Sequence, residues 1–223
     1  MKLPALALAL VTPLLFAAVP AGFTPIFDGK DLAGWHVSQT NHHGNSKGWT
    51  VKDGVLLATQ DRPGNGGILL TDKKYRDFEV SLEVDPDWGC DGGLFLRSNE
   101  AGDAYQVMID YLEGGSVGGV YGEGLEALKD GKGQLVNRDW QKHWKKGEWN
   151  LLRARIEGDV PHIRVWLNEV PLVDWTDSAN HSKDGATEGM IALQMHFSNE
   201  KTPRWKPGSF HRFRNIAVKE LPR

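Results

Sequence analysis

The sequence predicts an all-β protein, a sandwich of two packed antiparallel sheets. Short segments in which apolar and polar residues alternate recur along the chain, separated by clusters of Gly, Asp, Asn and Pro. This spacing is typical of sandwiches and barrels, whereas apolar periodicity of the helical kind is almost absent. The alternation predicts about ten strands, a number that suits two antiparallel sheets.

The N-terminal segment differs from the rest of the chain. Lys2 precedes an apolar run from Ala5 to Val19, which ends in the small-residue sequence Val19-Pro20-Ala21. This order is that of a secretory signal peptide. The run is shorter than the roughly 20 residues that a membrane span needs, and no second run of that length follows. We therefore expect a cleaved signal peptide over 1–21, a secreted or periplasmic location, no transmembrane span, and a single domain over 22–223.

Composition limits the partners and the source of stability. Cys90 is the single cysteine, so no intramolecular disulfide can form and burial must stabilise the fold. About 200 residues are enough for one such core. The formal net charge is −3, without long runs of one sign, so nucleic acid is not an expected partner.

The clearest strand is expected over residues 77–85, where apolar and polar side chains alternate strictly. Further strands are expected over 54–58, 67–71, 92–98, 104–111, 118–121, 148–157, 162–167, 189–197 and 210–220. Long polar loops are expected over 38–47, 122–146 and 174–186. The loop 122–146 is longer than compact domains usually contain, so we expect it to form a wall of a site.

Alternation also places polar side chains on shared faces of these strands. Gln106 and Asp110 share one face of 104–111, and Gln194 and His196 share one face of 189–197. Polar groups inside apolar strands are unfavourable unless they are paired or solvated, so we expect a concave, solvated face. The side chains expected there are Glu83, Arg97, Gln106, Asp110, Gln194 and His196. A simpler interpretation makes Arg97 and Asp110 an ordinary ion pair and His196 a half-buried strand histidine.

Loop-edge residues add candidates for sugar contacts. Trp88, Tyr121 and Trp205 could stack on a pyranose ring, or could simply pack at the rim of the sheet. Glu123 follows in the glycine-rich segment 118–124, where the backbone can approach a ligand closely. Its carboxylate is interpreted either as a positioned acid or as a solvated loop charge.

A set of short phrases is found in order along the chain. They are Phe27-Asp28-Gly29-Lys30-Asp31-Leu32-Ala33-Gly34-Trp35, Trp49–Leu56, Tyr75-Arg76-Asp77-Phe78, Gly93-Leu94-Phe95-Leu96-Arg97, Tyr105-Gln106, Gly118-Gly119-Val120-Tyr121, Gly147-Glu148-Trp149-Asn150, Trp166-Leu167-Asn168, Leu193-Gln194 and Phe213-Arg214-Asn215-Ile216. As a set they resemble the 3-keto-disaccharide hydrolase domain family, whose members are concanavalin A-like jelly rolls. One phrase departs from the family, because Asp91-Gly92-Gly93 stands where an Asn-Ser-Gly phrase is usual.

The resemblance implies an enzyme that acts on a glycoside or oxidised disaccharide whose C3 hydroxyl has become a ketone. The ketone acidifies the C2 proton, so cleavage can proceed by proton abstraction, elimination of the C1 substituent and hydration. On this sequence the expected roles are a base, Asp110 or His196; enolate stabilisation, Arg97; hydroxyl binding, Gln106 and Gln194; and a leaving-group acid, Glu123 or Glu83.

Two other functions remain open at this stage. One is a carbohydrate-binding module or lectin without turnover, which would use Trp88, Tyr121 and Trp205. The other is a conventional glycosidase with two carboxylates, such as Glu83 and Glu123. The Glu-x-Asp-x-x-Glu pattern of retaining glucanases is disfavoured, because Trp88 stands at the place of the second glutamate.

No metal site and no cofactor are predicted. His42 and His43 are adjacent and would face opposite ways on an extended chain, so the segment 41–45 is expected to be a solvated loop. A structural calcium ion is compatible with such a sandwich, although no ligand spacing calls for one.

Overall fold

The computed structural model describes residues 19–110, 112, 115–125 and 139–222. The predicted signal peptide lies almost entirely outside these residues, and so does the middle of the predicted loop 122–146. In the described part of the chain, no helix is both long enough and apolar enough to cross a membrane.

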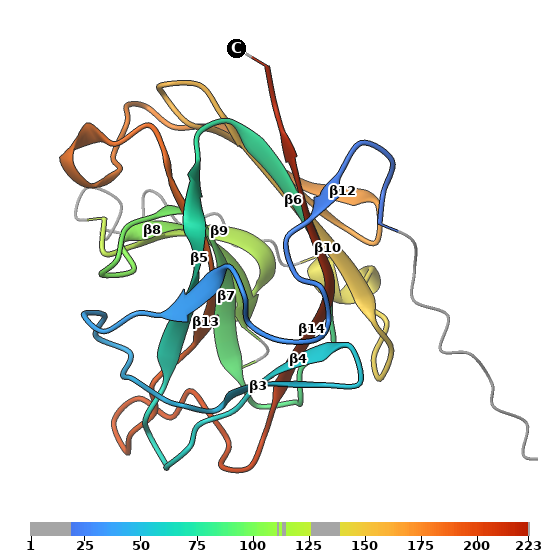
Figure 1. Ribbon diagram of the computed structural model, residues 1–223, viewed down its shortest axis with the longest axis vertical. Helices are drawn as coiled ribbons and strands as arrows, with labels where there is room; N and C mark the ends of the chain where they lie inside the picture. The colour runs from blue at the N-terminus through green and yellow to red at the C-terminus, as the bar shows by residue number, and fades with distance from the viewer. Residues whose placement is uncertain (1–18, 111, 113–114, 126–138, 223) are drawn as a thin grey trace, which may run out of the picture.

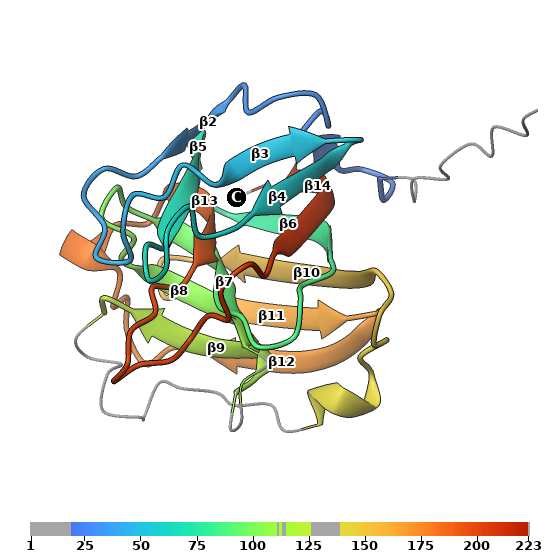
Figure 2. The ribbon, with the colours of Figure 1, turned by 90° about the horizontal axis from the view of Figure 1, so that it is seen from below.

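Two antiparallel sheets form the molecule, and Figures 1 and 2 show them as two packed layers. The first sheet contains β1 (Thr24–Pro25), β3 (Trp49–Lys52), β4 (Val55–Ala58), β6 (Phe78–Val84), β10 (Asn150–Glu157), β11 (His162–Leu167), β12 (Val170–Thr176) and β14 (His211–Glu220). The second contains β2 (Trp35–Val37), β5 (Gly67–Tyr75), β7 (Asp91–Ser98), β8 (Ala104–Asp110), β9 (Val117–Glu123) and β13 (Gly189–Met195). Two single-turn 3₁₀ helices, η2 (Trp140–Lys142) and η3 (Lys183–Gly185), lie in the connections.

The strand order explains how distant segments meet. The eight-stranded sheet has the order β12-β11-β10-β6-β14-β4-β3, with β1 beside β14, and the six-stranded sheet has the order β2-β5-β13-β7-β8-β9. The late strand β13 therefore pairs with both β5 and β7 in the second sheet. The predicted all-β jelly-roll sandwich of two antiparallel sheets is confirmed.

Each segment that was predicted as a strand contains one, although several boundaries differ. Alternation missed the short strands β1, β2 and β3 and the whole of β12, so the predicted loop 174–186 begins inside a strand. β12 follows β11 through a two-residue turn, Asn168-Glu169, in which both residues have positive φ, 49° and 67°. Tight hairpins commonly use such left-handed turn residues.

The core lies between the two sheets. Leu82 and Ala154 of the first sheet and Leu94, Val107 and Leu193 of the second are fully buried in one apolar cluster. Burial of each large aliphatic side chain stabilises the fold by about 1.5–3 kcal/mol. Inner positions of β10 and β11 alternate with partly exposed ones, as expected for strands with one face on the core.

The opposite face of the six-stranded sheet positions the site. At one end of this face a second apolar cluster is buried, which includes Phe95, Ala104 and Ala192. Toward the other end, the same face of β8 and β13 carries Gln106 and Gln194, both buried. The polar face expected for β8 and β13 therefore exists, and it lies on this one sheet.

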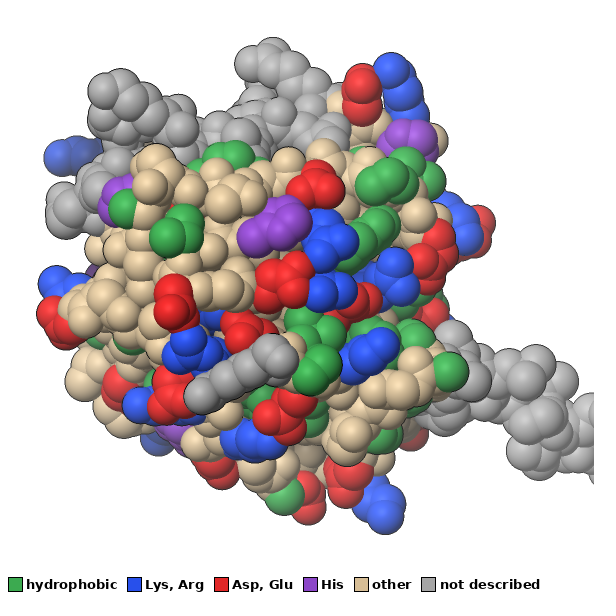
Figure 3. Space-filling view, turned by 90° about the horizontal axis from the view of Figure 1, so that it is seen from above, with side chains coloured by type: hydrophobic (Ala, Val, Ile, Leu, Met, Phe, Trp, Pro, Cys, Tyr) green, Lys and Arg blue, Asp and Glu red, His purple; other side chains and the backbone are tan. Residues whose placement is uncertain are grey.

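The end of the molecule seen in Figure 3 carries acidic and basic side chains that are interspersed. Many charges pair across neighbouring strands, as Arg153 Nε does with Glu79 Oε1 at 3.2 Å. Such partly exposed pairs contribute little to the free energy of unfolding, about 0–1 kcal/mol each. Their main effect is to keep this surface polar and hydrated.

Candidate functional site

A cavity of about 470 Å³ opens at the polar end of the six-stranded sheet. Its volume falls in the range of about 300–1,000 Å³ that is usual for ligand pockets. Its walls are formed by His42, Asp91, Gln106, Met108, Asp110, Tyr121, Glu123, His196, Phe197, Thr202 and Arg204. Among the predicted site residues, the structure brings together Asp110, His196, Glu123, Gln106 and Tyr121 here, with Gln194 directly behind Gln106.

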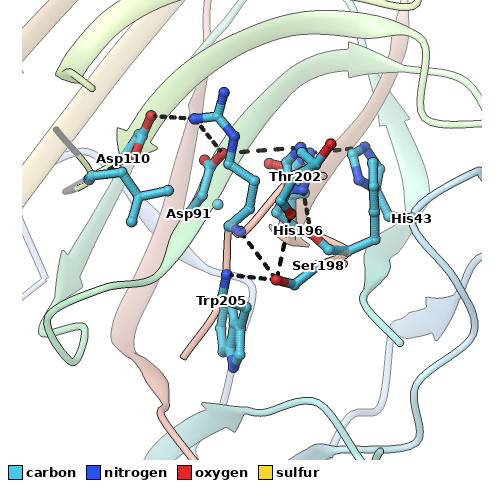
Figure 4. A network of polar contacts seen from close by, with 12 residues as sticks. His43, Asp91, Asp110, His196, Ser198, Thr202 and Trp205 are labelled. Carbon is cyan, nitrogen blue, oxygen red and sulfur yellow. Dashed lines mark hydrogen bonds and ion pairs between the residues drawn. The ribbon is translucent and has the colours of Figure 1, made fainter. Parts of the chain in front are cut away.

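Two buried aspartates form the acidic side of the cavity. Asp91 begins β7 and Asp110 ends β8, and the two residues are register partners in the β7–β8 ladder. Arg204 Nη1 lies 3.8 Å from Asp91 Oδ2 and 3.4 Å from Asp110 Oδ2, and Figure 4 shows Asp91 and Asp110 next to each other.

The environment raises the pKa of both carboxyl groups. Burial and then the charge of Asp110 raise the pKa of Asp91 well above its ordinary value, and burial raises the pKa of Asp110. One guanidinium cannot fully compensate two buried carboxylates that face each other. The pair therefore holds one proton over a range of pH in which isolated aspartates are ionised, and it titrates as a unit.

His196 stands beside this pair in the neutral state. Its Nδ1 lies 2.6 Å from the carbonyl oxygen of Phe197 and donates to it, which leaves Nε2 unprotonated at 3.9 Å from Asp91 Oδ2. Burial lowers the pKa of His196 to about 4. The imidazole thus presents an unprotonated nitrogen on the side of Asp91 and carries no charge near neutral pH.

An oriented chain of amides crosses the floor of the cavity. Gln106 Nε2 donates to Gly92 O at 3.2 Å and to Gln194 Oε1 at 2.9 Å. Gln194 Nε2 then faces His43 Nε2 at 2.9 Å, so that this ring nitrogen is the acceptor. Gly93 makes room for the chain, because a Cβ atom there would lie 2.4 Å from Gln106 Nε2.

The expectation of a solvated loop holds for His42, which is exposed, but is wrong for His43. His43 is 1% exposed, and the two rings lie 4.0 Å apart instead of facing opposite ways. Both reach Glu123, whose Oε1 is 3.1 Å from His42 Nε2 and 3.5 Å from His43 Nε2. The loop between β2 and β3 folds over the sheet here, which adjacency in sequence does not indicate.

Glu123 remains an ionised carboxylate in this position. Burial acts to raise its pKa, but the neighbouring His42 and His43 outweigh burial and lower the pKa of Glu123 to about 2. It has no proton to donate near neutral pH, which does not suit the expected role of leaving-group acid. Glu123, His42 and His43 instead offer three donor atoms within 4.8 Å of one another.

Arg97 does not belong to this cavity. Its guanidinium is buried and donates to Arg76 O at 2.7 Å, Gly158 O at 2.9 Å and Asp77 Oδ1 at 2.8 Å. Arg97 has a φ of 55°, and the register of the adjoining β13 shifts nearby. This irregularity breaks the alternation that placed Arg97 with the site residues. The expected ion pair with Asp110 is also wrong, since Asp77 is the partner.

Glu83 also lies elsewhere. It belongs to β6 in the eight-stranded sheet, where its Oε2 accepts a hydrogen bond from Arg214 Nε at 2.7 Å. Alternation identified the polar face of β6 but could not indicate which sheet β6 joins. A glycosidase that pairs Glu83 with Glu123 is therefore excluded by the fold.

The two predicted tryptophans are not in the cavity wall. Trp88 is 58% exposed and lies under Lys146 Nζ, 5.3 Å from its ring centroid. Trp205 is buried in the core, 5.0 Å from the ring of His211, and Figure 4 shows its ring pointing away from the polar network. Among the three aromatic residues predicted to stack on sugar, Tyr121 alone lines the cavity.

Sequence reasoning missed several residues of the cavity, above all Asp91 and Arg204. Asp91 lies two residues before Gly93 and therefore on the same face of the strand. Alternation would have placed Asp91 in the site if the predicted strand had begun one residue earlier. Its place in the Asp91-Gly92-Gly93 phrase, where the family usually carries Asn, was a second signal. Arg204, Phe197 and Thr202 come from the connection between β13 and β14, and no pattern in the sequence indicates that it returns to the sheet.

Comparisons with known proteins identify a matching family. The family model of the 3-keto-alpha-glucoside-1,2-lyase-like domain matches residues 22–219. A 3-keto-disaccharide hydrolase of Bacteroides thetaiotaomicron is 30% identical over 97 residues, which cover 41% of this chain and 33% of that relative. The match thus spans about a third of the relative's own length.

Solved structures with the same fold come from Parabacteroides distasonis. One candidate glycosyl hydrolase is 24% identical with a TM-score of 0.60, over 89% of this chain and 99% of that one. A second is 21% identical with a TM-score of 0.58, over 90% and 94% of the two chains. At these identities the likeness shows a shared fold.

Proposed function

The chain belongs to the family of 3-keto-alpha-glucoside-1,2-lyase-like domains, and from this premise we propose that it cleaves the glycosidic bond of 3-keto-glycosides. Membership over residues 22–219 makes it a carbohydrate-active, glycoside-hydrolase-like protein. The proposed cleavage of 3-keto-glycosides rests mainly on the buried Asp91–Asp110 pair, which faces a cavity of about 470 Å³. A pair that holds one proton supplies a base and an acid in the same pocket.

The chemistry requires little more than this pair. A ketone at C3 acidifies the proton on C2, because the resulting carbanion delocalises onto the C3 oxygen as an enolate. The enolate then reforms the ketone and expels the C1 substituent, so that a C1=C2 double bond remains in the sugar ring. The oxygen of the departing substituent takes up one proton. Addition of water across that bond puts hydroxyl on C1 and hydrogen on C2. The sum is hydrolysis, without an external oxidant or reductant.

We assign the roles from position and protonation state. Asp110, the less perturbed carboxyl group, takes the C2 proton as its carboxylate, and the protonated Asp91 supplies the proton to the leaving oxygen. Arg204 lies between them and is partly exposed, so its charge can stabilise the enolate oxygen, the role that the sequence had indicated for Arg97. Gln106 and Tyr121 line the cavity where they can contact sugar hydroxyls and a ring face.

A non-catalytic sugar-binding role has less support. That alternative depended on a platform of three aromatic residues, and the structure keeps Tyr121 at the cavity while Trp88 and Trp205 lie outside its wall. A buried, partly protonated carboxyl pair is unfavourable for folding and serves no purpose in simple stacking.

The decisive experiment compares a 3-keto-glycoside with its parent glycoside in D₂O. We expect free sugar from the keto substrate alone, with one deuterium incorporated at C2 of the product. Deuterium at C2 reports proton abstraction, which direct displacement at C1 does not involve. Cleavage of the parent glycoside without deuterium at C2 is incompatible with the proposal.

We further propose that the protein acts outside the cytoplasm. The support is the sequence from Met1 to Ala21, with its basic start, apolar run and small-residue end. Cell fractionation combined with N-terminal sequencing tests this directly: an exported chain that begins near Gly22 is expected, and a cytoplasmic chain that keeps Met1 contradicts it.

A further inference from the structure

His42, His43 and Glu123 form a cluster that the acid–base chemistry does not use. The two histidines lie in the connection between β2 and β3, and Glu123 is the last residue of β9. Glu123 Oε1 is 3.1 Å from His42 Nε2 and 3.5 Å from His43 Nε2. The three donor atoms all lie within 4.8 Å of one another, and no other such group of three occurs in the described ranges. We propose that this cluster is a binding site for a divalent transition-metal ion.

The spacing fits a shared ion. Imidazole nitrogen and carboxylate oxygen bind Zn²⁺ at about 2.0–2.2 Å, so two such ligands at a tetrahedral angle stand about 3.4 Å apart. The two observed separations, 3.1 Å and 3.5 Å, lie on either side of that value. Little movement of the side chains is needed for one ion to contact all three.

The electrostatics also favour a cation. The Glu123 side chain is 12% exposed, and within the described ranges its ion-pair partners are these two histidines. Neither imidazole carries a permanent charge, and a largely buried carboxylate is unfavourable without a positive partner. A divalent ion supplies that charge and leaves both histidines as neutral ligands.

The structure holds the innermost ligand in place. The His43 backbone N–H donates to Asn41 Oδ1 at 2.9 Å, which anchors the loop. On the sheet side, the Gln194 amide lies 2.9 Å from His43 Nε2. An ion must take over the lone pair that this amide contacts, so binding is expected to displace the Gln194 amide from His43 Nε2.

The donor set indicates the class of ion. Two imidazoles and one carboxylate suit Zn²⁺, Co²⁺, Fe²⁺ or Mn²⁺, whereas Ca²⁺ and Mg²⁺ prefer oxygen ligands throughout. His42 and Glu123 line the same cavity as Asp91 and Asp110. An ion with three protein ligands therefore keeps open positions toward the substrate, as catalytic rather than structural sites do.

This placement extends the proposed function and rests on it. With the C3 ketone oxygen of the substrate at an open position, the ion draws electron density from the carbonyl and acidifies the C2 proton. The proton still passes to Asp110, and the ion neither gains nor loses an electron. Arg204 and the ion would then share the negative charge that develops on the enolate.

The test measures ion binding without substrate. The purified chain is treated with a chelator, dialysed, and titrated with Zn²⁺ by calorimetry and with Co²⁺ by visible absorption. We expect one ion per chain, with d–d bands of a low-coordinate Co²⁺ site, and at least 100-fold weaker binding in Glu123→Gln and in His42→Ala. His42 is exposed, so its removal should leave the fold intact.

His36→Ala is the matched control, since His36 also contacts two carboxylates, Asp72 at 2.6 Å and Glu100 at 3.0 Å, on the surface. It should bind as the wild type does. Equal binding, or no binding, by the wild type and Glu123→Gln overturns the inference. A chain that binds no ion yet cleaves the 3-keto-glycoside overturns the metal site alone; one that binds the ion without cleaving overturns the proposed function alone.

Discussion

Asp91 and Asp110 face each other across the β7–β8 ladder, and Arg204 Nη1 contacts both, at 3.8 Å and 3.4 Å. This relationship joins the consecutive strands β7 and β8 to a connection that is far from them in sequence. It places two carboxyl groups and one permanent cation around the same volume, so one proton is retained in the pair. Most of the mechanistic expectations for this protein follow from that proton.

The first prediction concerns removal of either carboxyl group. Asp110→Asn and Asp91→Asn keep the size of the side chain but abolish proton transfer, and each should lower kcat on a 3-keto-glycoside by about 10²- to 10⁴-fold. Initial rates with matched circular dichroism spectra check this. Asp72→Asn, at an exposed aspartate outside the cavity, should keep the wild-type rate. Retention of more than half the activity in either site variant removes that residue from the mechanism.

The second prediction is the pH dependence. Asp110 must be ionised to act as a base, so activity should fall as pH decreases through its raised pKa. Asp91 must be protonated to act as an acid, so activity should fall again as pH increases through its own raised pKa. The plot of kcat/KM against pH should therefore be bell-shaped and lie above the range of ordinary carboxyl groups.

Arg204 gives this pH profile an internal control. Its charge lowers the pKa of both aspartates, while the carboxylate of Glu123 acts to raise that of Asp91. Arg204→Gln should thus move the acid limb to higher pH as well as reduce the rate. An unchanged acid limb in Arg204→Gln would show that Asp110 does not set it.

The sequence predicts strands such as β10 and β11 well because one face of each is buried, and this condition imposes alternation along the chain. Gln106 and Gln194 were assigned to a common face on this basis, and the structure brings them within hydrogen-bonding distance. The same reasoning failed for Glu83, because alternation indicates which face of a strand is solvated but not which sheet the strand joins. Sheet membership depends on long-range pairing, here β6 with β10 and β14.

The other errors arise where backbone or loop geometry is irregular. Arg97 has positive φ beside a register shift, and neither feature follows from residue types. His43 is buried because a loop folds back over the sheet, and Arg204 enters the cavity from a connection without periodicity. Loops complete the site around its strand residues, and tertiary contacts rather than local patterns place them.

The third prediction separates Arg97 from the catalytic groups. Arg97→Met leaves Asp77 without its buried partner and two backbone carbonyls without donors, so it should lower the free energy of unfolding by about 3–5 kcal/mol. Urea denaturation measures this loss. The kcat of the folded fraction should be unchanged, since Arg97 lies outside the cavity.

Arg155→Met is the matched variant for Arg97→Met, because Arg155 pairs with Glu157 at a partly exposed position. It should change the free energy of unfolding by less than about 1 kcal/mol. A catalytic defect in folded Arg97→Met, at normal stability, would return Arg97 to the site.

The fourth prediction tests the amide chain on the cavity floor. In Gly93→Ala the new Cβ atom would lie 2.4 Å from Gln106 Nε2, so the Gln106 amide must move and give up its bonds to Gly92 O and Gln194. We expect an increase in KM, and a loss of about 1–3 kcal/mol in the free energy of unfolding from the unpaired buried groups. Gln106→Ala in the Gly93→Ala background should add little further loss, because both changes remove the same interaction.

The last prediction concerns a histidine in the core and the stability of the fold in acid. His211 is fully buried, and neither of its ring nitrogens has a hydrogen-bond partner among the residues that the structure describes. Burial lowers the pKa of His211 to about 3, against about 6.5 in the unfolded chain. Between these values the unfolded state binds a proton that the folded state does not, so this residue reduces stability progressively as pH falls.

His211→Phe removes this proton linkage and keeps an aromatic ring against Trp205, 5.0 Å away. The free energy of unfolding should rise by about 1–3 kcal/mol at pH 7, because no buried polar atom remains unpaired. It should also decline less steeply between about pH 6.5 and pH 4, which urea denaturation across that interval measures.

His36→Gln should change the slope in the opposite direction: partial burial acts to lower the pKa of His36, but the carboxylates of Glu100 and Asp72 prevail and raise it. Its stabilisation is therefore present in acid and lost as pH increases, and parallel slopes in the two variants would contradict both assignments.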